Sequence, residues 1–158
     1  MVRKIMMFSI LGVIGLGVLG VLGLFVGARL APRPANLGVT NGQLAACPNA
    51  PNCVSTQTEN PSQAMPPLSY TGTTAEAKVR LMNIIRAQPR VEVLAQTPVY
   101  IATVFRTPTM QFPDDVEFLF DEQASVIHFR SASRLGEGDM GVNRARMTMI
   151  SEQFAAQQ

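Results

Sequence analysis

The residues of this chain that could do chemistry are arginines and polar partners gathered mostly in its C-terminal third. Guanidinium groups bind carboxylates and phosphates through paired hydrogen bonds, so such a gathering either closes on itself or receives an external anion. The cluster comprises Asp114, Asp115, Arg130, Arg134, Asp139, Asn143, Arg144 and Arg146. We call these residues the Arg/Asp cluster.

Three interpretations of the Arg/Asp cluster remain open. The favoured one is structural: Asp139, Asp114 and Asp115 offset the unfavourable cations near the start of a final helix and fix the Gly-rich loop to the sheet. The second is an anion pocket in which Arg130, Arg134 and Arg144 join the helix N-terminus to hold a carboxylate or a lipid head group. The third is catalysis, which is disfavoured because arginine rarely acts as a base and His128 is the only histidine.

Familiar catalytic and cofactor motifs do not occur in the sequence. Ser55, Ser131 and Ser133 stand outside any G-x-S-x-G context, and there is no P-loop or dinucleotide fingerprint. We therefore predict no cofactor and favour a non-catalytic domain over an enzyme. Zinc sites usually use four nitrogen or sulfur ligands, whereas two cysteines and one histidine supply three at most, so no metal is predicted.

The two cysteines, Cys47 and Cys53, enclose a short segment with two prolines. An even number of cysteines outside the cytoplasm favours a disulfide, which would contribute about 2 kcal/mol by loop entropy. Metal binding and two unpaired thiols are the alternatives, and a redox dithiol usually has the C-x-x-C spacing.

The charge distribution argues against nucleic-acid binding. Four of the thirteen basic residues flank the N-terminal segment, and the other nine stand among all eleven acidic ones, which leaves that part at −2. A protein that binds a polyanion by counterion release needs a basic field instead.

The N-terminal part predicts a single membrane span. Ile5 to Ala28 is uncharged over 24 residues, longer than the apolar core of a signal peptide, and no A-x-A site follows. We expect a cytoplasmic N-terminus (1–4), a transmembrane helix (5–28), a Pro/Asn-rich linker (29–67) and an α+β domain (68–158). Arg3 and Lys4 favour a domain on the non-cytoplasmic side of a bacterial inner membrane, facing the periplasm, with the lipid bilayer as partner.

Glycines in the predicted span could support self-association. Small residues on one helix face let two helices approach closely, although glycine is common in membrane helices generally. The four that share a face are Gly12, Gly20, Gly23 and Gly27.

The remaining sequence predicts a small α+β domain. A capping-box pattern at Thr73 to Glu76 opens a helix that ends near Ala87, and a second helix runs from about Gly141 to Phe154. Four strand-like runs lie between the helices, the clearest of which alternates Val116, Phe118 and Phe120 with polar residues. We predict a four-stranded antiparallel sheet with two helices packed on one face. The runs are Val91 to Gln96, Val99 to Arg106, Asp115 to Asp121 and Val126 to Ser131.

Three ordered motifs give the chain a resemblance to a known family. They are the segment from Cys47 to Ser55, the segment from Phe112 to Phe118, and Arg130 to Arg134 continued by Gly136, Asp139, Gly141, Asn143, Arg144 and Arg146. From about Leu44 to Phe154 the chain resembles the domain of unknown function 1499 (DUF1499) family, departing from it at Thr56 and Gly138. The resemblance implies an envelope or plastid setting and no particular activity. We expect a membrane-anchored cell-envelope protein with a non-catalytic binding or structural domain; the alternative is an enzyme, or an anion or lipid-head-group site, built on the Arg/Asp cluster.

Overall fold

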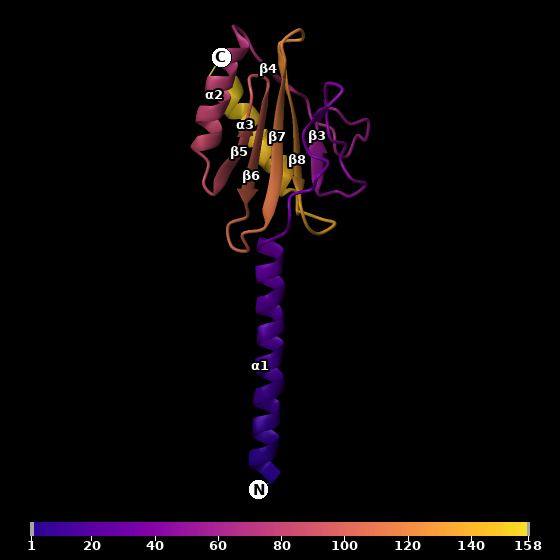
Figure 1. Ribbon diagram of the computed structural model, residues 1–158, viewed down its shortest axis with the longest axis vertical. Coiled ribbons are helices and arrows are strands. Elements are labelled where there is room, and N and C mark those ends of the chain that lie inside the picture. The colour runs from indigo at the N-terminus through magenta and orange to yellow at the C-terminus, as the bar shows by residue number, and fades with distance from the viewer. Residues whose placement is uncertain (1, 158) are drawn as a thin grey trace. The chain divides into compact units, whose positions relative to one another are not determined.

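The computed structural model describes residues 2–157, except for the side chains of residues 2–11, 13 and 24. The chain divides into two compact units, Met1–Ala31 and Pro32–Gln158. The first unit contains the helix α1 (Val2–Arg29), and the second contains the remaining elements (Figure 1).

The predicted transmembrane span is corrected by the structure. No helix among the described residues is both long enough and apolar enough to cross a membrane, which overturns the predictions of a span over residues 5–28 and of a single-pass inner-membrane location. The predicted cytoplasmic N-terminus, residues 1–4, lies outside the described side chains.

The glycines of α1 are open at their Cβ positions. No atom lies within 4 Å of the place where a Cβ would stand at Gly12, Gly20, Gly23 or Gly27. Their role in self-association stays a prediction.

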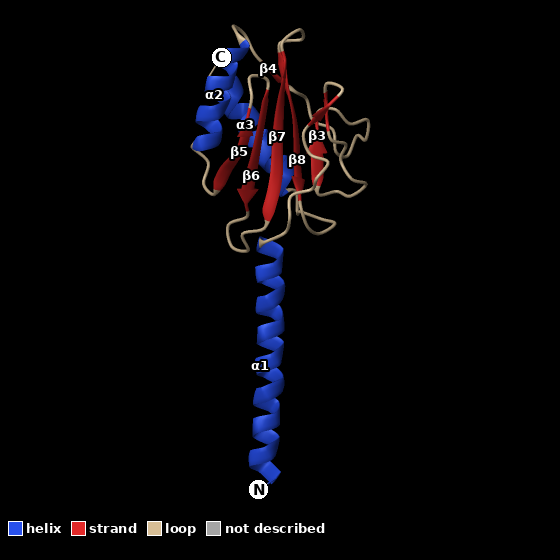
Figure 2. Cartoon of the chain, in the orientation of Figure 1, coloured by secondary structure: helices blue, strands red, loops and turns tan. Residues whose placement is uncertain are grey.

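The second unit is built on an antiparallel sheet of six strands rather than the predicted four (Figure 2). Neighbouring strands follow the order β3-β8-β7-β6-β5, and β4 also pairs with β8. The strands are β3 (Cys53–Ser55), β4 (Leu68–Ser69), β5 (Val91–Gln96), β6 (Tyr100–Arg106), β7 (Pro113–Asp121) and β8 (Val126–Ser133). The four predicted strands lie where they were expected, and the error is the omission of β3 and β4, which have three and two residues and are too short to show an alternating pattern.

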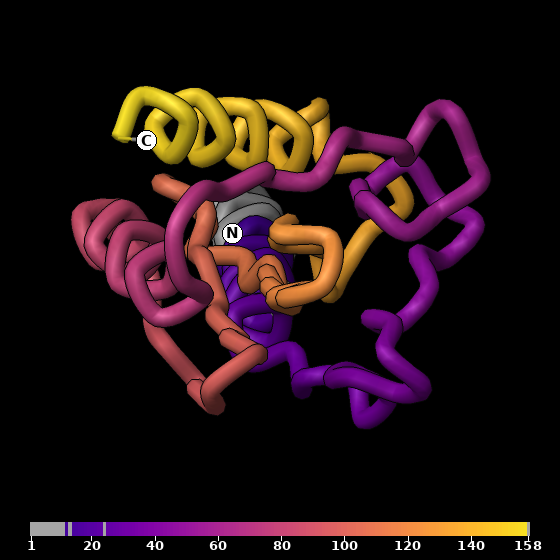
Figure 3. Tube along the Cα trace, turned by 90° about the horizontal axis from the view of Figure 1, so that it is seen from above, coloured from indigo at the N-terminus to yellow at the C-terminus, as the bar shows by residue number. Residues whose placement is uncertain are grey.

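Two helices cover one face of the sheet, as Figure 3 shows along one side of the domain. α2 (Thr74–Arg86) begins with a capping box in which Thr73 and Glu76 bind each other's backbone, and α3 (Val142–Ala155) follows β8. The alternating side chains of β7 explain the packing, because Val116, Phe118 and Phe120 join the helices in one hydrophobic core.

The opposite face of the sheet is covered by the chain that precedes β3. A small hairpin of β1 (Val39–Thr40) and β2 (Gln43–Leu44) lies there, and β2 contacts β7 and β8. Asp115 and Glu117 of β7 are therefore 2% and 0% exposed, although the alternating sequence pattern of β7 predicts that they lie on the solvent-exposed face of a half-buried strand. This stretch falls within the predicted linker, whose polar composition gives no sign that it covers a sheet.

Candidate functional site

The structure splits the Arg/Asp cluster between the two faces of the sheet. Consecutive residues of a strand point to opposite faces, so Asp114 points towards α3 while Asp115 points away from it. Each carboxylate has its own arginine partner. The predicted cluster is thus two separate networks that share the strands β7 and β8.

The network on the helix side, which we call the α3 network, is centred on Arg146 and Asn143. Arg146 Nη2 donates to Asp114 Oδ2 at 2.5 Å, and Arg146 Nη1 donates to Ser131 Oγ and to Asn143 Oδ1 at 3.1 and 2.8 Å. The guanidinium carbon of Arg146 also lies 5.0 Å from the centre of the Phe105 ring. Since Asp114 and Asn143 are 1% and 0% exposed, this network is a rigid internal frame.

Asn143 connects the α3 network to the loop before α3. Its Nδ2 group donates to Asn52 O, Ser133 Oγ and Asp139 Oδ2 at 3.0, 3.0 and 2.8 Å. Asp139 also accepts from the backbone N–H groups of Gly141 and Asn143, and so caps the helix start. Burial alone would raise the pKa of Asp139, but these hydrogen bonds outweigh it and lower the pKa.

The network on the opposite face contains Arg134 and Asp115. Arg134 binds the carboxylate of Asp115 in a bidentate pair, with Nε and Nη2 at 2.9 and 2.8 Å from its two oxygens. Arg33 Nε lies 3.9 Å from the same carboxylate. Arg144 joins neither network, because its guanidinium donates to the carbonyl oxygens of Ser62 and Ala64.

Glu117 and Arg130 form a second buried pair on that face. They are register partners on β7 and β8, and Arg130 Nη1 lies 3.8 Å from Glu117 Oε2. Glu117 Oε1 accepts from Tyr100 Oη at 2.5 Å and from Gly38 N at 2.7 Å. Burial and Glu117 raise the pKa of the Tyr100 hydroxyl, whereas burial lowers the pKa of the Arg130 guanidinium. Tyr100 was missed at the sequence level, since a tyrosine that begins a strand carries no functional signal.

The predicted disulfide between Cys47 and Cys53 is confirmed. The enclosed loop is held by Gln63, whose Nε2 donates to the carbonyl oxygens of Pro48 and Ala50 at 2.8 Å each. Asn52, the residue before Cys53, accepts the hydrogen bond from Asn143 through its carbonyl oxygen. The disulfide loop therefore supports the α3 network.

The geometry of the described residues gives little basis for a metal or acid–base centre. Within the described part of the chain, no group of three or more histidine, cysteine or acidic residues could hold a metal ion. His128 Nδ1 lies 3.1 Å from the Thr56 hydroxyl, on the opposite side of the sheet from Asp114. Among the described residues, we find no third group that would orient His128 as a catalytic base.

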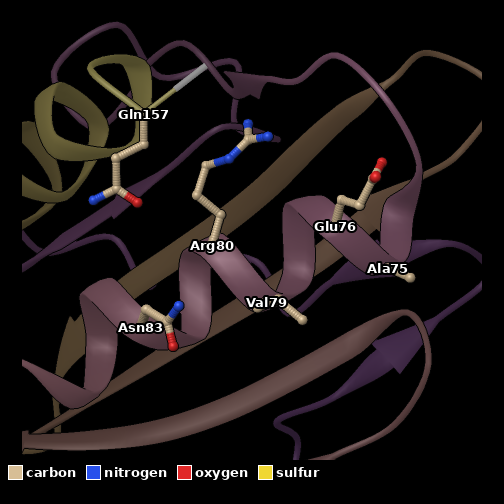
Figure 4. Close-up of a pocket in the computed structure, with 6 residues that line it drawn as sticks. All are labelled: Ala75, Glu76, Val79, Arg80, Asn83 and Gln157. Carbon is tan, nitrogen blue, oxygen red and sulfur yellow. The ribbon is translucent and has the colours of Figure 1, made fainter.

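One cavity of about 490 Å³ lies along α2, and Figure 4 shows its lining residues. Arg80 lies 5.4 Å over the ring of Phe154, with its Nη1 buried and without a hydrogen-bond partner. Glu76 lines the same cavity and is already bound to Thr73. Because the lining comes almost entirely from one helix face and carries both signs of charge, it defines no clear ligand chemistry.

A second cavity, of about 370 Å³, lies where three separate parts of the chain meet. It is lined by residues 88–90, residues 105–108 and the first turns of α3. Three of its eleven lining residues, Arg90, Arg106 and Arg146, are arginines, and none is acidic. We call this cavity the arginine pocket. Only Arg146 belongs to the predicted Arg/Asp cluster.

The backbone of the arginine pocket carries one unfavourable feature. Arg90 has a left-handed φ of 57°, which non-glycine residues seldom adopt. Arg90 and Arg106 also face each other at the end of the β5–β6 ladder, where Arg106 N donates to Arg90 O and Arg90 Nε donates to Arg106 O. Arg106 Nη1 also lies 3.5 Å from Gln111 O, so both arginines make contacts with the backbone of neighbouring segments.

Comparison with known proteins adds one finding. A family model described as "Protein of unknown function (DUF1499)" matches residues 43–154, which is most of the chain and includes the α3 network and the arginine pocket. No curated protein matches the chain.

Proposed function

The chain belongs to the DUF1499 family, and we propose that its domain is a non-catalytic binding domain whose ligand enters the arginine pocket. The observation that carries the proposal is the lining of the pocket, which combines arginines with the apolar surfaces of Phe105, Val142 and Met149. Its volume of about 370 Å³ falls in the range of small-molecule sites, and such sites combine apolar walls with a few polar groups.

The lining favours binding over catalysis. Arginine stays protonated near neutral pH and is a poor general base. Thr107 carries the one hydroxyl group of the lining, and its oxygen accepts a hydrogen bond from Phe112 N. No residue of the lining could remove the proton from that hydroxyl, so the pocket has no activated nucleophile.

One wall of the pocket is rigid before any ligand arrives. Arg146 is fixed by three hydrogen-bond partners and by the ring of Phe105, and its side chain is 8% exposed. A preorganised wall loses little conformational entropy on binding, which favours affinity. We therefore assign the α3 network a supporting role, in which it holds Arg146 in place beneath the ligand.

The test is a titration of the full chain with octanol, octanoate and octylammonium, in which binding is monitored by NMR through the amide resonances of Thr107 and Ala145. We expect at least one of the three compounds to shift both resonances. Ala145 is exposed on α3 and lines the pocket, so Ala145→Phe should fill the space and abolish the shifts. Ala155→Phe, on the same helix and outside the pocket lining, is the control. The proposal fails if none of the compounds binds, or if Ala145→Phe binds as well as Ala155→Phe.

A further inference from the structure

We propose that the sheet face opposite α2 and α3 is a second binding face, which residues 33–44 cover and which receives an extended peptide segment of a partner protein when they move away. We call residues 33–44 the strap. Asp115 and Glu117 of this face point away from α3, so the face is separate from the arginine pocket and the inference does not depend on that pocket.

The strap lies on the sheet without being part of it. Its strands β1 and β2 form a two-stranded sheet of their own, and among the described residues no backbone–backbone hydrogen bond joins the strap to the six-stranded sheet. Its polar contacts with β7 are the hydrogen bond from Gly38 N to Glu117 Oε1, at 2.7 Å, and the approach of Arg33 Nε to Asp115 Oδ1, at 3.9 Å. The strap can therefore leave the face without breaking a strand pair of the main sheet.

The face beneath the strap keeps two polar atoms unsatisfied. Glu117 Oε2 and Arg130 Nε are buried, and neither has a hydrogen-bond partner among the described residues. Arg130 Nη1 lies 3.8 Å from Glu117 Oε2, which is longer than a hydrogen bond. A buried donor or acceptor without a partner costs free energy, so the strap covers this face without satisfying it.

The unsatisfied atoms indicate the chemistry of the ligand. The strap already binds Glu117 Oε1 through the main-chain N–H group of Gly38. Glu117 Oε2 needs a further donor and Arg130 Nε needs an acceptor, and a peptide group supplies one of each. The two acids of this face, Asp115 and Glu117, are paired with two arginines, so the uncovered face carries no net charge. These properties favour the neutral main chain of an extended segment, which can replace the hydrogen bond of the strap and satisfy the other two atoms.

Hydrogen exchange of the unmodified full chain tests whether the strap opens by itself. After correction for intrinsic rates, the amide of Gly38 should exchange at least about a hundredfold faster than that of Phe118, because local opening breaks far fewer contacts than unfolding of the core. Equal protection of the two amides would show that the strap leaves only when the whole domain unfolds, and would overturn the proposal.

A peptide supplied separately tests whether the face accepts a segment of another chain. Gly38→Pro removes the N–H group that binds Glu117 and imposes a φ near −65° where the structure has 120°, so it should release the strap. The probe is a synthetic peptide of residues 32–46, and its binding to the full-length variant is monitored by NMR through the amide resonances of Glu117 and Arg130. Ala35→Pro is the matched control, because Ala35 is exposed and its N–H group makes no hydrogen bond among the described residues.

We expect the peptide to bind Gly38→Pro at least about tenfold more tightly than it binds Ala35→Pro or the unmodified protein, in which the attached strap competes at high effective concentration. A peptide with sarcosine in place of Gly38 lacks only the N–H group and should bind roughly tenfold more weakly.

Equal binding to all three proteins, no binding to Gly38→Pro, or an unchanged affinity of the sarcosine peptide would overturn the proposal, and so would unfolding of Gly38→Pro. A self-associated form of the unmodified protein that the peptide dissociates would assign the face to a second copy of the chain instead of a partner. The titrations of the arginine pocket are independent of all these results.

Discussion

Replacing Arg134 by methionine tests whether the Arg/Asp cluster is structural. The substitution keeps an unbranched side chain and removes the guanidinium that forms two hydrogen bonds, of 2.9 and 2.8 Å, to Asp115. The carboxylate of Asp115 is 3% exposed, so it would be left in a site that water hardly reaches. A structural role predicts a loss of stability, and an anion site made of the same arginine predicts none.

The expected magnitude follows from the surroundings of Asp115. Removing one partner of a buried ion pair costs about 3–5 kcal/mol, because a charge remains without compensation. Arg33 remains, with its Nε 3.9 Å from Asp115 and its side chain 35% exposed, and a pair of that kind restores about 1 kcal/mol at most. The net loss in the free energy of unfolding should therefore be about 2–4 kcal/mol.

The measurement is chemical denaturation followed by circular dichroism, with Arg144→Met as the matched control. Arg144 binds only carbonyl oxygens of the chain at an exposed position, so its substitution should cost less than about 1 kcal/mol. Adding Asp115→Asn to Arg134→Met should recover part of the loss, since the unpaired buried charge is gone. A stability of Arg134→Met equal to or above that of the unmodified protein would refute the structural assignment of Arg134.

Two further predictions concern the parts that support the pocket. Hydrogen bonds lower the pKa of Asp139 in the folded protein, so its carboxylate stabilises the fold at pH values above the unfolded pKa of about 3.9. This stabilisation is lost as the pH falls through the lower folded pKa. Asp139→Asn should therefore reduce the loss of unfolding free energy at acid pH, measured by denaturation from pH 7 downwards. Without reductant, Cys47 and Cys53 should resist alkylation in denaturant, and reduction should lower the free energy of unfolding by about 2 kcal/mol; rapid labelling of the unreduced protein would contradict the disulfide.

The sequence predicts the regular elements of the domain well where they are long and patterned. The nine residues of β7 alternate clearly, and the capping box at Thr73 and Glu76 marks the start of α2. The β7–β8 hairpin has a short turn, and its register places Glu117 opposite Arg130. These features depend on neighbours in the chain, which is why a single sequence reveals them.

Features that depend on distant segments were missed. β3 pairs with β8, which lies more than seventy residues later in the chain, and the three residues of β3 carry no pattern that predicts this pairing. The burial of Asp115 and Glu117 depends on the hairpin of β1 and β2, and therefore escaped a pattern in which acidic residues mark the solvent face. The predicted membrane span was also wrong, since no helix among the described residues is both long enough and apolar enough to cross a membrane.

The arginines of the Arg/Asp cluster were predicted to form a site because they are close in sequence, yet most of them bind partners within the fold. The two arginines that dominate the charge of the pocket are sixteen residues apart, and each looks like an ordinary residue at the end of a strand. Only the β5–β6 register brings Arg90 and Arg106 into opposition, and only the packing of α3 adds Arg146 and the apolar wall beside them. Closeness of arginines in the sequence and closeness of arginines in the fold are thus different properties. Asp114 and Asp115 each bind one arginine of the cluster and hold it on one face of the sheet, whereas strand pairing and helix packing bring Arg90, Arg106 and Arg146 to one pocket.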